Sequence, residues 1–96
     1  HKPAAVISSS RRAGSVTSMD VLNKHLSISE MPIVTSNYWN EVHGHTPSDV
    51  EQDREGLDTM YALGKNMAWM LKCIEAGKKA GIEVPQNKKR TTNFIR

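Results

Sequence analysis

The chain has 96 residues, which is enough for one domain, and a hydrophobic fraction of 38%, which is low but compatible with a folded core. No apolar run approaches the roughly 18 residues of a membrane-spanning helix, so we expect no membrane segment and a cytoplasmic location. The single cysteine, Cys73, excludes a disulfide within the chain and a multi-cysteine metal site, and we expect it to be a buried, inert thiol.

The net charge of +3 is unevenly distributed. Residues 78–96 contain six basic residues and one acid, whereas the other 77 residues contain seven basic and nine acidic ones. The body is therefore mildly acidic and the tail is basic. A basic tail is usually just solvated, so we do not expect nucleic acid as the main partner. A small nucleic-acid binder that uses this tail stays an alternative.

A β-strand is the first element that we expect. Residues 4–7 (Ala-Ala-Val-Ile) are continuously apolar, which is typical of a parallel strand covered on both faces. Because a natural domain usually has a few free residues before its first strand, we expect that preceding sequence is missing. A loop at residues 11–14 follows, and its Gly14 permits a positive φ or a close backbone approach.

A short helix and a second strand come next. Thr17 and Asp20 match a capping box and predict a helix that ends before Ser29. Residues 31–36 predict a second buried strand, with Pro32 tolerated at its start. Two such strands joined by one short helix predict a βαβ unit with parallel strands.

A long helix ends the predicted order. Thr46 and Asp49 match a second capping box, and we expect a helix from about residue 47 to 80, near 50 Å long, with Gly81 as its stop. Its apolar residues recur every three or four positions, which predicts a stripe that faces the core. The stripe consists of Leu57, Met60, Gly64, Met67, Leu71 and Ile74, widened by Leu63 and Met70.

The residues that could carry chemistry follow the two predicted strands, where ligands of an open parallel sheet bind. The first loop has hydroxyls, two arginines and a glycine. It could hold a polar, electron-rich ring edge, or be an ordinary turn with solvated arginines. Tyr38 and Trp39 could stack on a flat cofactor, cover a neighbouring subunit, or pack under their loop. His43 and His45 lack a third metal ligand of recognisable spacing, so we expect loop hydrogen bonding and no metal.

With these residues in view, the chain resembles the NADPH-dependent FMN reductase family of flavodoxin-like flavoproteins, in the branch of multimeric flavodoxins and iron–sulfur flavoproteins. The matching pieces are residues 2–14 (KPAAVISSSRRAG), 20–25 (DVLNKH), 31–34 (MPIV), 38–44 (YWNEVHG), 46–50 (TPSDV) and 64–69 (GKNMAW). The resemblance implies an α/β fold: the C-terminal half of a three-layer parallel-sheet domain, in the order strand, helix, strand, long helix. Residues 1–85 would form this part of the domain, and residues 86–96 the basic tail.

The resemblance also implies an FMN-dependent NAD(P)H oxidoreductase of the flavin or quinone reductase type, with NADPH or NADH as co-substrate. The flavin carries the chemistry in such enzymes, so no catalytic residue is assigned. The cofactor-binding residues that the resemblance implies are Ser9, Ser10, Arg11, Arg12, Ala13, Gly14, Tyr38, Trp39, Asn40 and His43.

The family's phosphate-binding loop, which follows its first strand, has no counterpart in this sequence. We therefore expect the 96-residue chain alone to hold no complete FMN site and to be inactive. Two strands and one long helix leave a strand edge open, so we expect association with a missing N-terminal half or with copies of the chain. The alternative from another class is a non-enzymatic module that oligomerises through the stripe from Leu57 to Ile74.

Overall fold

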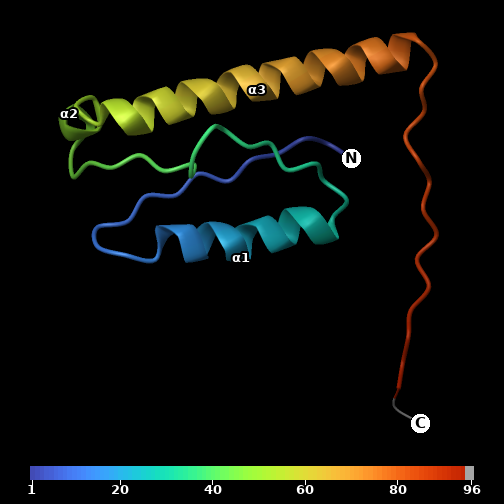
Figure 1. The fold of residues 1–96 in the computed structure, drawn as a ribbon. Coiled ribbons are helices and arrows are strands. Elements are labelled where there is room, and N and C mark those ends of the chain that lie inside the picture. Colours follow the sequence, from blue (N-terminus) through green and yellow to red (C-terminus); the bar gives the residue numbers. More distant parts are fainter. Residues whose placement is uncertain (95–96) are drawn as a thin grey trace.

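Three helices make up the regular structure of residues 1–94, the part of the chain that this computed structural model describes. They are α1 (Ser15–Ile28), α2 (Pro47–Val50) and α3 (Arg54–Lys79). Helix α3 runs along one side of the molecule and α1 along the other, and two extended segments lie between them (Figure 1). No β-strand forms among the described residues. The predicted α/β fold with a three-layer parallel sheet is therefore wrong.

The two extended segments nevertheless run side by side in the predicted parallel direction. They touch at two isolated parallel bridges, Ala4 with Ile33 and Ser8 with Glu41. The bridged residues are four positions apart on the first segment and eight positions apart on the second. Residues between the bridges on the second segment must therefore leave the pairing line. This mismatch, and the lack of a third segment to extend the pairing, explains why no continuous ladder forms.

The start of α1 differs from the prediction. Gly14 is the N-cap, with a left-handed φ of 92°, and no side chain caps the helix. The Ser18 hydroxyl instead donates to the Gly14 carbonyl oxygen at 2.9 Å. The predicted capping box at Thr17 is therefore wrong, because the left-handed turn at Gly14 caps the helix three residues earlier. The predicted end, before Ser29, is confirmed.

The second capping box is confirmed, but the helix that it starts is short. The Asp49 N–H donates to the Thr46 hydroxyl at 3.3 Å, and the Thr46 N–H donates to the Asp49 carboxylate at 2.9 Å. Helix α2 ends at Val50, and α3 begins only at Arg54. Asp53 is the N-cap of α3, and its carboxylate accepts the Gly56 N–H at 2.9 Å. The prediction of a single helix over residues 47–80 is therefore wrong for its N-terminal part, where two helices form.

The predicted stop of the long helix is confirmed. Gly81 has a left-handed φ of 82°. Its N–H donates to the Lys78 carbonyl at 3.0 Å, and the Ile82 N–H donates to the Gly77 carbonyl at 2.9 Å. These two bonds form a Schellman motif, which satisfies carbonyls that the helix end would otherwise leave free.

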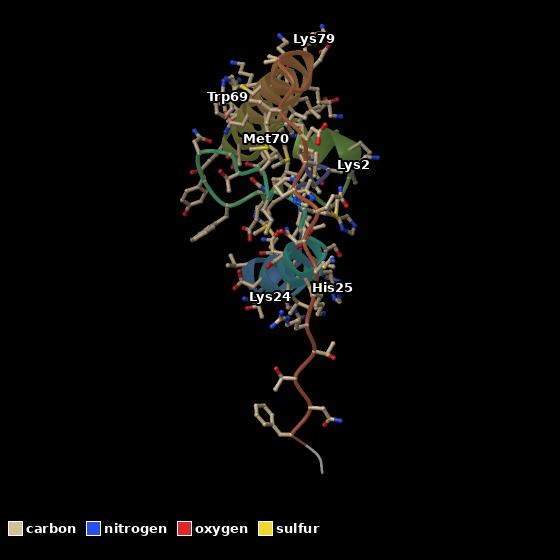
Figure 2. All side chains as sticks on the ribbon, turned by 90° about the vertical axis from the view of Figure 1, so that its right-hand side faces the viewer. Lys2, Lys24, His25, Trp69, Met70 and Lys79 are labelled. Atoms are coloured by element: carbon tan, nitrogen blue, oxygen red, sulfur yellow. The ribbon has the colours of Figure 1, made fainter. Side chains whose placement is uncertain are left out.

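The core is small and lies between α3, the extended segments and α1. Only Met19, Val34 and Leu63 are buried hydrophobic residues in the described part of the chain. On α3, Met70 lies on the side toward the extended segments, whereas Lys79 points away from them (Figure 2). The side of α3 that is most covered consists of Gly56, Thr59 and Leu63, followed by the half-buried Met67, Met70 and Ile74.

Part of the predicted core stripe is therefore exposed. Leu71 keeps 48% of its surface accessible, and Gly64 is exposed as well. Cys73 is also exposed, so the prediction of a buried thiol is wrong. The covered side of α3 is rotated by a fraction of a turn from the predicted stripe, because the extended segments and α1 cover only one narrow sector of the helix.

The molecule is flat and open. Its dimensions are 50 × 46 × 18 Å and its radius of gyration is 17.4 Å, whereas a compact domain of this length has about 12.5 Å. Residues 82–94 leave the body as an exposed, extended tail (Figure 1). Phe94 is 90% exposed, and residues 95–96 of the predicted basic tail lie outside the described residues. None of the described helices has the length and apolar character needed to cross a membrane.

Candidate functional site

The pairing of the extended segments brings the two predicted loops to the same place. After the bridge between Ser8 and Glu41, the residues that follow next in each segment line one cavity of about 460 Å³. Its lining residues are Ser9, Ser10, Arg11, Arg12, His43, Gly44 and His45. Five of the ten predicted cofactor-binding residues therefore lie around one cavity, which we call the arginine cavity.

The arginine cavity is rich in hydrogen-bond donors. It has two serine hydroxyls, two guanidinium groups and two imidazoles, and Arg11 and Arg12 are both exposed. His43 lies beside an acid, with Nε2 3.4 Å from a Glu41 carboxylate oxygen. A guanidinium carries only donors, so this lining suits a ligand edge that is rich in acceptors or carries negative charge.

The position of His43 is fixed by its backbone. The His43 N–H donates to the Asp53 carboxylate at 2.7 Å, and the other carboxylate oxygen accepts the Gly56 N–H at 2.9 Å. These bonds hold the pKa of Asp53 below its ordinary value of 3.8, the Gly56 bond being the larger cause and His43 the next. One aspartate thereby starts α3 and ties it to the wall of the arginine cavity.

Asn40 joins the two extended segments rather than facing the arginine cavity. Its side-chain amide donates to the Val6 backbone carbonyl at 3.0 Å, and the backbone carbonyl of Asn40 accepts the Ser8 N–H at 3.0 Å. The side-chain amide of Asn40 thus makes a structural contact, while the residue also lines a second cavity that is described below. This contact stabilises the pairing that positions the neighbouring loops.

Tyr38 and Trp39 line a second cavity, next to α1. Their ring centroids are 6.0 Å apart at an angle of 44°, and the residues are 63% and 56% exposed. This cavity has a volume of about 450 Å³, and we call it the aromatic cavity. Its other lining residues are Val16, Met19, Asp20, Asn23, Ile33, Thr35, Ser36, Asn37 and Asn40.

A small hollow shares lining residues with both cavities. Tyr38, Trp39 and His43 together line a third depression of about 60 Å³, which also includes Asp53. The segment that precedes Tyr38 and Trp39 is joined to α3, because the Asn66 side-chain amide donates to the Thr35 carbonyl at 2.7 Å. The predicted aromatic residues therefore lie beside the arginine cavity without entering it.

Two predicted residues, Ala13 and Gly14, line neither cavity. Gly14 serves instead as the N-cap of α1. Sequence reasoning missed the contribution of α1 to the aromatic cavity and the role of Asp53. An Asp three residues before a buried glycine, at the start of a long helix, is the sequence signal that could have indicated Asp53 as a cap.

No metal centre is present in the described part of the chain, where no three His, Cys, Asp or Glu side chains come together as a ligand group. His43 and His45 belong to no such group. In comparisons with protein-family models, curated proteins and solved structures, nothing matched this chain.

Proposed function

We propose that this chain supplies one side of the flavin site in an FMN-dependent NAD(P)H oxidoreductase of the flavin or quinone reductase type. The observation that supports the proposal is the arginine cavity, where Ser9 to Arg12 meet His43 to His45 next to an exposed aromatic pair. The proposal rests on this cavity and on the sequence resemblance, and it does not require the sheet that was predicted.

The donor set of the cavity fits the polar edge of a flavin ring. That edge presents carbonyl oxygens and ring nitrogens, which serine hydroxyls and the guanidinium groups of Arg11 and Arg12 can satisfy. The fixed positive charge of the arginines favours the electron-rich, reduced form of the ring. Tyr38 and Trp39 offer flat surfaces beside the cavity on which a ring can stack.

When bound, FMN supplies hydride and electron transfer between the nicotinamide and an acceptor. The residues of this chain orient the ring and set the charge around it. Asn40 and Asp53 act indirectly, because they hold the segments that carry the serines, the arginines and His43.

The FMN phosphate needs a second polypeptide segment. The chain has no glycine-rich loop, since its six glycines are scattered along the sequence. We therefore propose that a segment outside these 96 residues, or another copy of the chain, completes the site. The 96 residues alone then bind the ring weakly and do not catalyse NADPH oxidation. A cytoplasmic location, where NADPH is available, is part of this proposal.

A titration with riboflavin, which has the ring but no phosphate, tests the ring site directly. We expect weak binding to the 96-residue chain. The quenching of flavin fluorescence measures this binding. Replacing both arginines (R11A/R12A) removes charged hydrogen bonds and should weaken binding by about tenfold or more. The matched control removes two charges from the tail (K88A/K89A) and should leave the affinity unchanged. Equal affinity in the R11A/R12A variant, or equal loss in both variants, would contradict the proposal.

A further inference from the structure

Unpaired polar atoms lie in the wall of the aromatic cavity. Among the described residues, three side-chain oxygens are buried without a hydrogen-bond partner, and they belong to Asn23, Asn40 and Glu41. Asn23 and Asn40 both line the aromatic cavity. Buried polar groups of folded proteins are nearly always hydrogen-bonded, because an unpaired one costs free energy. Two such oxygens in the wall of one cavity therefore favour a ligand that carries hydrogen-bond donors.

The two asparagines differ in how firmly they are held. The Asn40 side-chain nitrogen donates to the Val6 backbone carbonyl at 3.0 Å, so the atom without a partner must be the oxygen. The Asn23 oxygen has no partner either, and the residue as a whole is only half-buried. The Asn23 amide can therefore turn toward a molecule in the cavity, whereas Asn40 is fixed.

The charge of the aromatic cavity is opposite to that of the arginine cavity. Among the described residues that line it, the only charged side chain is Asp20, whereas the arginine cavity has two guanidinium groups. Asp20 and Asn23 are three residues apart on α1, which places them on the same side of the helix. The two cavities share no lining residue, so they suit different ligands.

The apolar part of the wall favours a flat ring. Val16 and Met19 of α1 and Ile33 of the second extended segment supply apolar surface. Tyr38 and Trp39 are both more than half exposed, so their ring faces are accessible for stacking. The cavity volume of about 450 Å³ lies within the range of small-molecule sites.

An asparagine amide pairs with the edge of adenine through two hydrogen bonds. The adenine amino group donates to the amide oxygen, and the amide nitrogen donates to ring nitrogen N7. Guanine presents two acceptors at the same edge, which arginine and lysine recognise. Neither residue type is among those that line this cavity. The second hydrogen of the adenine amino group suits the Asp20 carboxylate, which can only accept when it is ionised.

We propose that the aromatic cavity binds an adenine-type ring, which stacks on Tyr38 or Trp39 and forms hydrogen bonds with Asn23 and Asp20. The ring is the part that is recognised, so a free nucleoside is a sufficient probe. Because no residue of the arginine cavity lines the aromatic cavity, this binding stands or fails separately from the proposed function.

Two nucleosides that differ in one group test the contact to the amino group. Adenosine and inosine have the same sugar and the same pair of fused rings, but inosine has a carbonyl oxygen in place of the amino group. In titrations followed by the NMR shifts of backbone amides, the wild-type chain should bind adenosine about fivefold or more tightly than inosine. Equal affinities, tighter binding of inosine, or no shifts up to the solubility limit of adenosine would overturn the proposal.

Asn23→Ala removes the amide that pairs with the ring, so it should abolish the preference for adenosine over inosine. The matched control, Ser27→Ala, also replaces a small polar side chain of α1, but Ser27 is exposed and does not line the aromatic cavity. It should keep the wild-type preference, and circular dichroism should show equal helix content in both variants. A preference that survives in N23A would overturn the proposal. So would an R11A/R12A variant that loses adenosine binding while N23A retains it, because adenosine would then occupy the arginine cavity.

Tryptophan emission locates the bound ring. The chain has two tryptophans, of which Trp39 lines the aromatic cavity and Trp69 lines a different one. In Trp69→Phe, the emission comes from Trp39 and should change along the same binding curve as the NMR shifts. In Trp39→Phe, the emission comes from Trp69 and should stay constant as adenosine is added. A response of Trp69 alone, or of neither tryptophan, would overturn the proposal.

Discussion

The Asp53 carboxylate accepts the backbone N–H of His43 at 2.7 Å, and this bond joins the start of the longest helix to the wall of the arginine cavity. The same carboxylate caps α3 through the Gly56 N–H. Asparagine at this position has one acceptor oxygen and alanine has none. We therefore predict a graded loss of helix content and melting temperature, small for Asp53→Asn and larger for Asp53→Ala. Circular dichroism measures both.

The control for this series is Asp58→Asn, a change of the same charge at an exposed position of α3. It should leave the melting temperature close to that of the wild type. A D53A protein as stable as D58N would show that the Asp53 bonds contribute nothing to the start of α3.

Stability should fall on the acid side. Hydrogen bonds hold the pKa values of Asp49 and Asp53 below 3.8, with the Thr46 side chain as the main cause for Asp49 and the Gly56 N–H for Asp53. A lowered pKa in the folded state means that the ionised carboxylates stabilise the fold above pH 3.8. This stabilisation is lost as the pH falls below that value. The melting temperature of the wild type should drop in this range, and that of D49N/D53N should drop less. Parallel pH profiles for the two proteins would refute this assignment.

Leu63 should carry much of the stability of the core. It is the only buried large hydrophobic residue that α3 contributes among the described residues, with 6% of its surface accessible. Leu63→Ala should lower the free energy of unfolding by about 2–4 kcal/mol, as cavity-forming substitutions do. Leu22→Ala, on the exposed side of α1 at 48% accessibility, should cost much less. Urea denaturation of both variants measures the difference, and equal losses would mean that Leu63 is not in the core.

Two glycines of α3 should respond to alanine with opposite signs. A Cβ at Gly56 would overlap the Asp53 carboxylate and lie 3.0 Å from the Val42 Cα, so Gly56→Ala should destabilise the fold by about 1–3 kcal/mol. A Cβ at Gly77 would meet only Ile82, at 3.7 Å, which is an ordinary contact. Gly77→Ala should therefore stabilise α3 by up to about 1 kcal/mol. A neutral G56A in urea denaturation would show that α3 and the segment at Val42 do not pack closely.

The local signals of the sequence predicted the ends of elements well. The capping box of Thr46 and Asp49 forms as expected, and Gly81 stops the long helix through a Schellman motif. These features depend on residues three to five positions apart, so the sequence is sufficient to predict them. The start of α3 at Asp53 also has a local signal, the Gly56 N–H three residues on, but the bond from the His43 N–H to Asp53 joins residues ten positions apart, and no local pattern reveals it.

The fold class was beyond the reach of the same reasoning. Apolar runs at residues 4–7 and 31–34 indicated strands, and the two segments do run parallel, but a ladder also needs matched spacing and further strands. The residue type alone predicts a buried thiol at Cys73, yet the few elements available cover only a narrow sector of α3 and leave it exposed. At the site, both predicted loops meet at the arginine cavity, while Ala13 and Gly14 do not take part in it.

The most direct test of the proposed function is to map riboflavin on the 96-residue chain by NMR, following backbone amide shifts as the ligand is added. The account predicts that the amides of residues 9–12 and 43–45 shift together and follow one binding curve as riboflavin is added up to its solubility limit. Shifts confined to other parts of the chain, or no shifts up to the solubility limit of riboflavin, would contradict it.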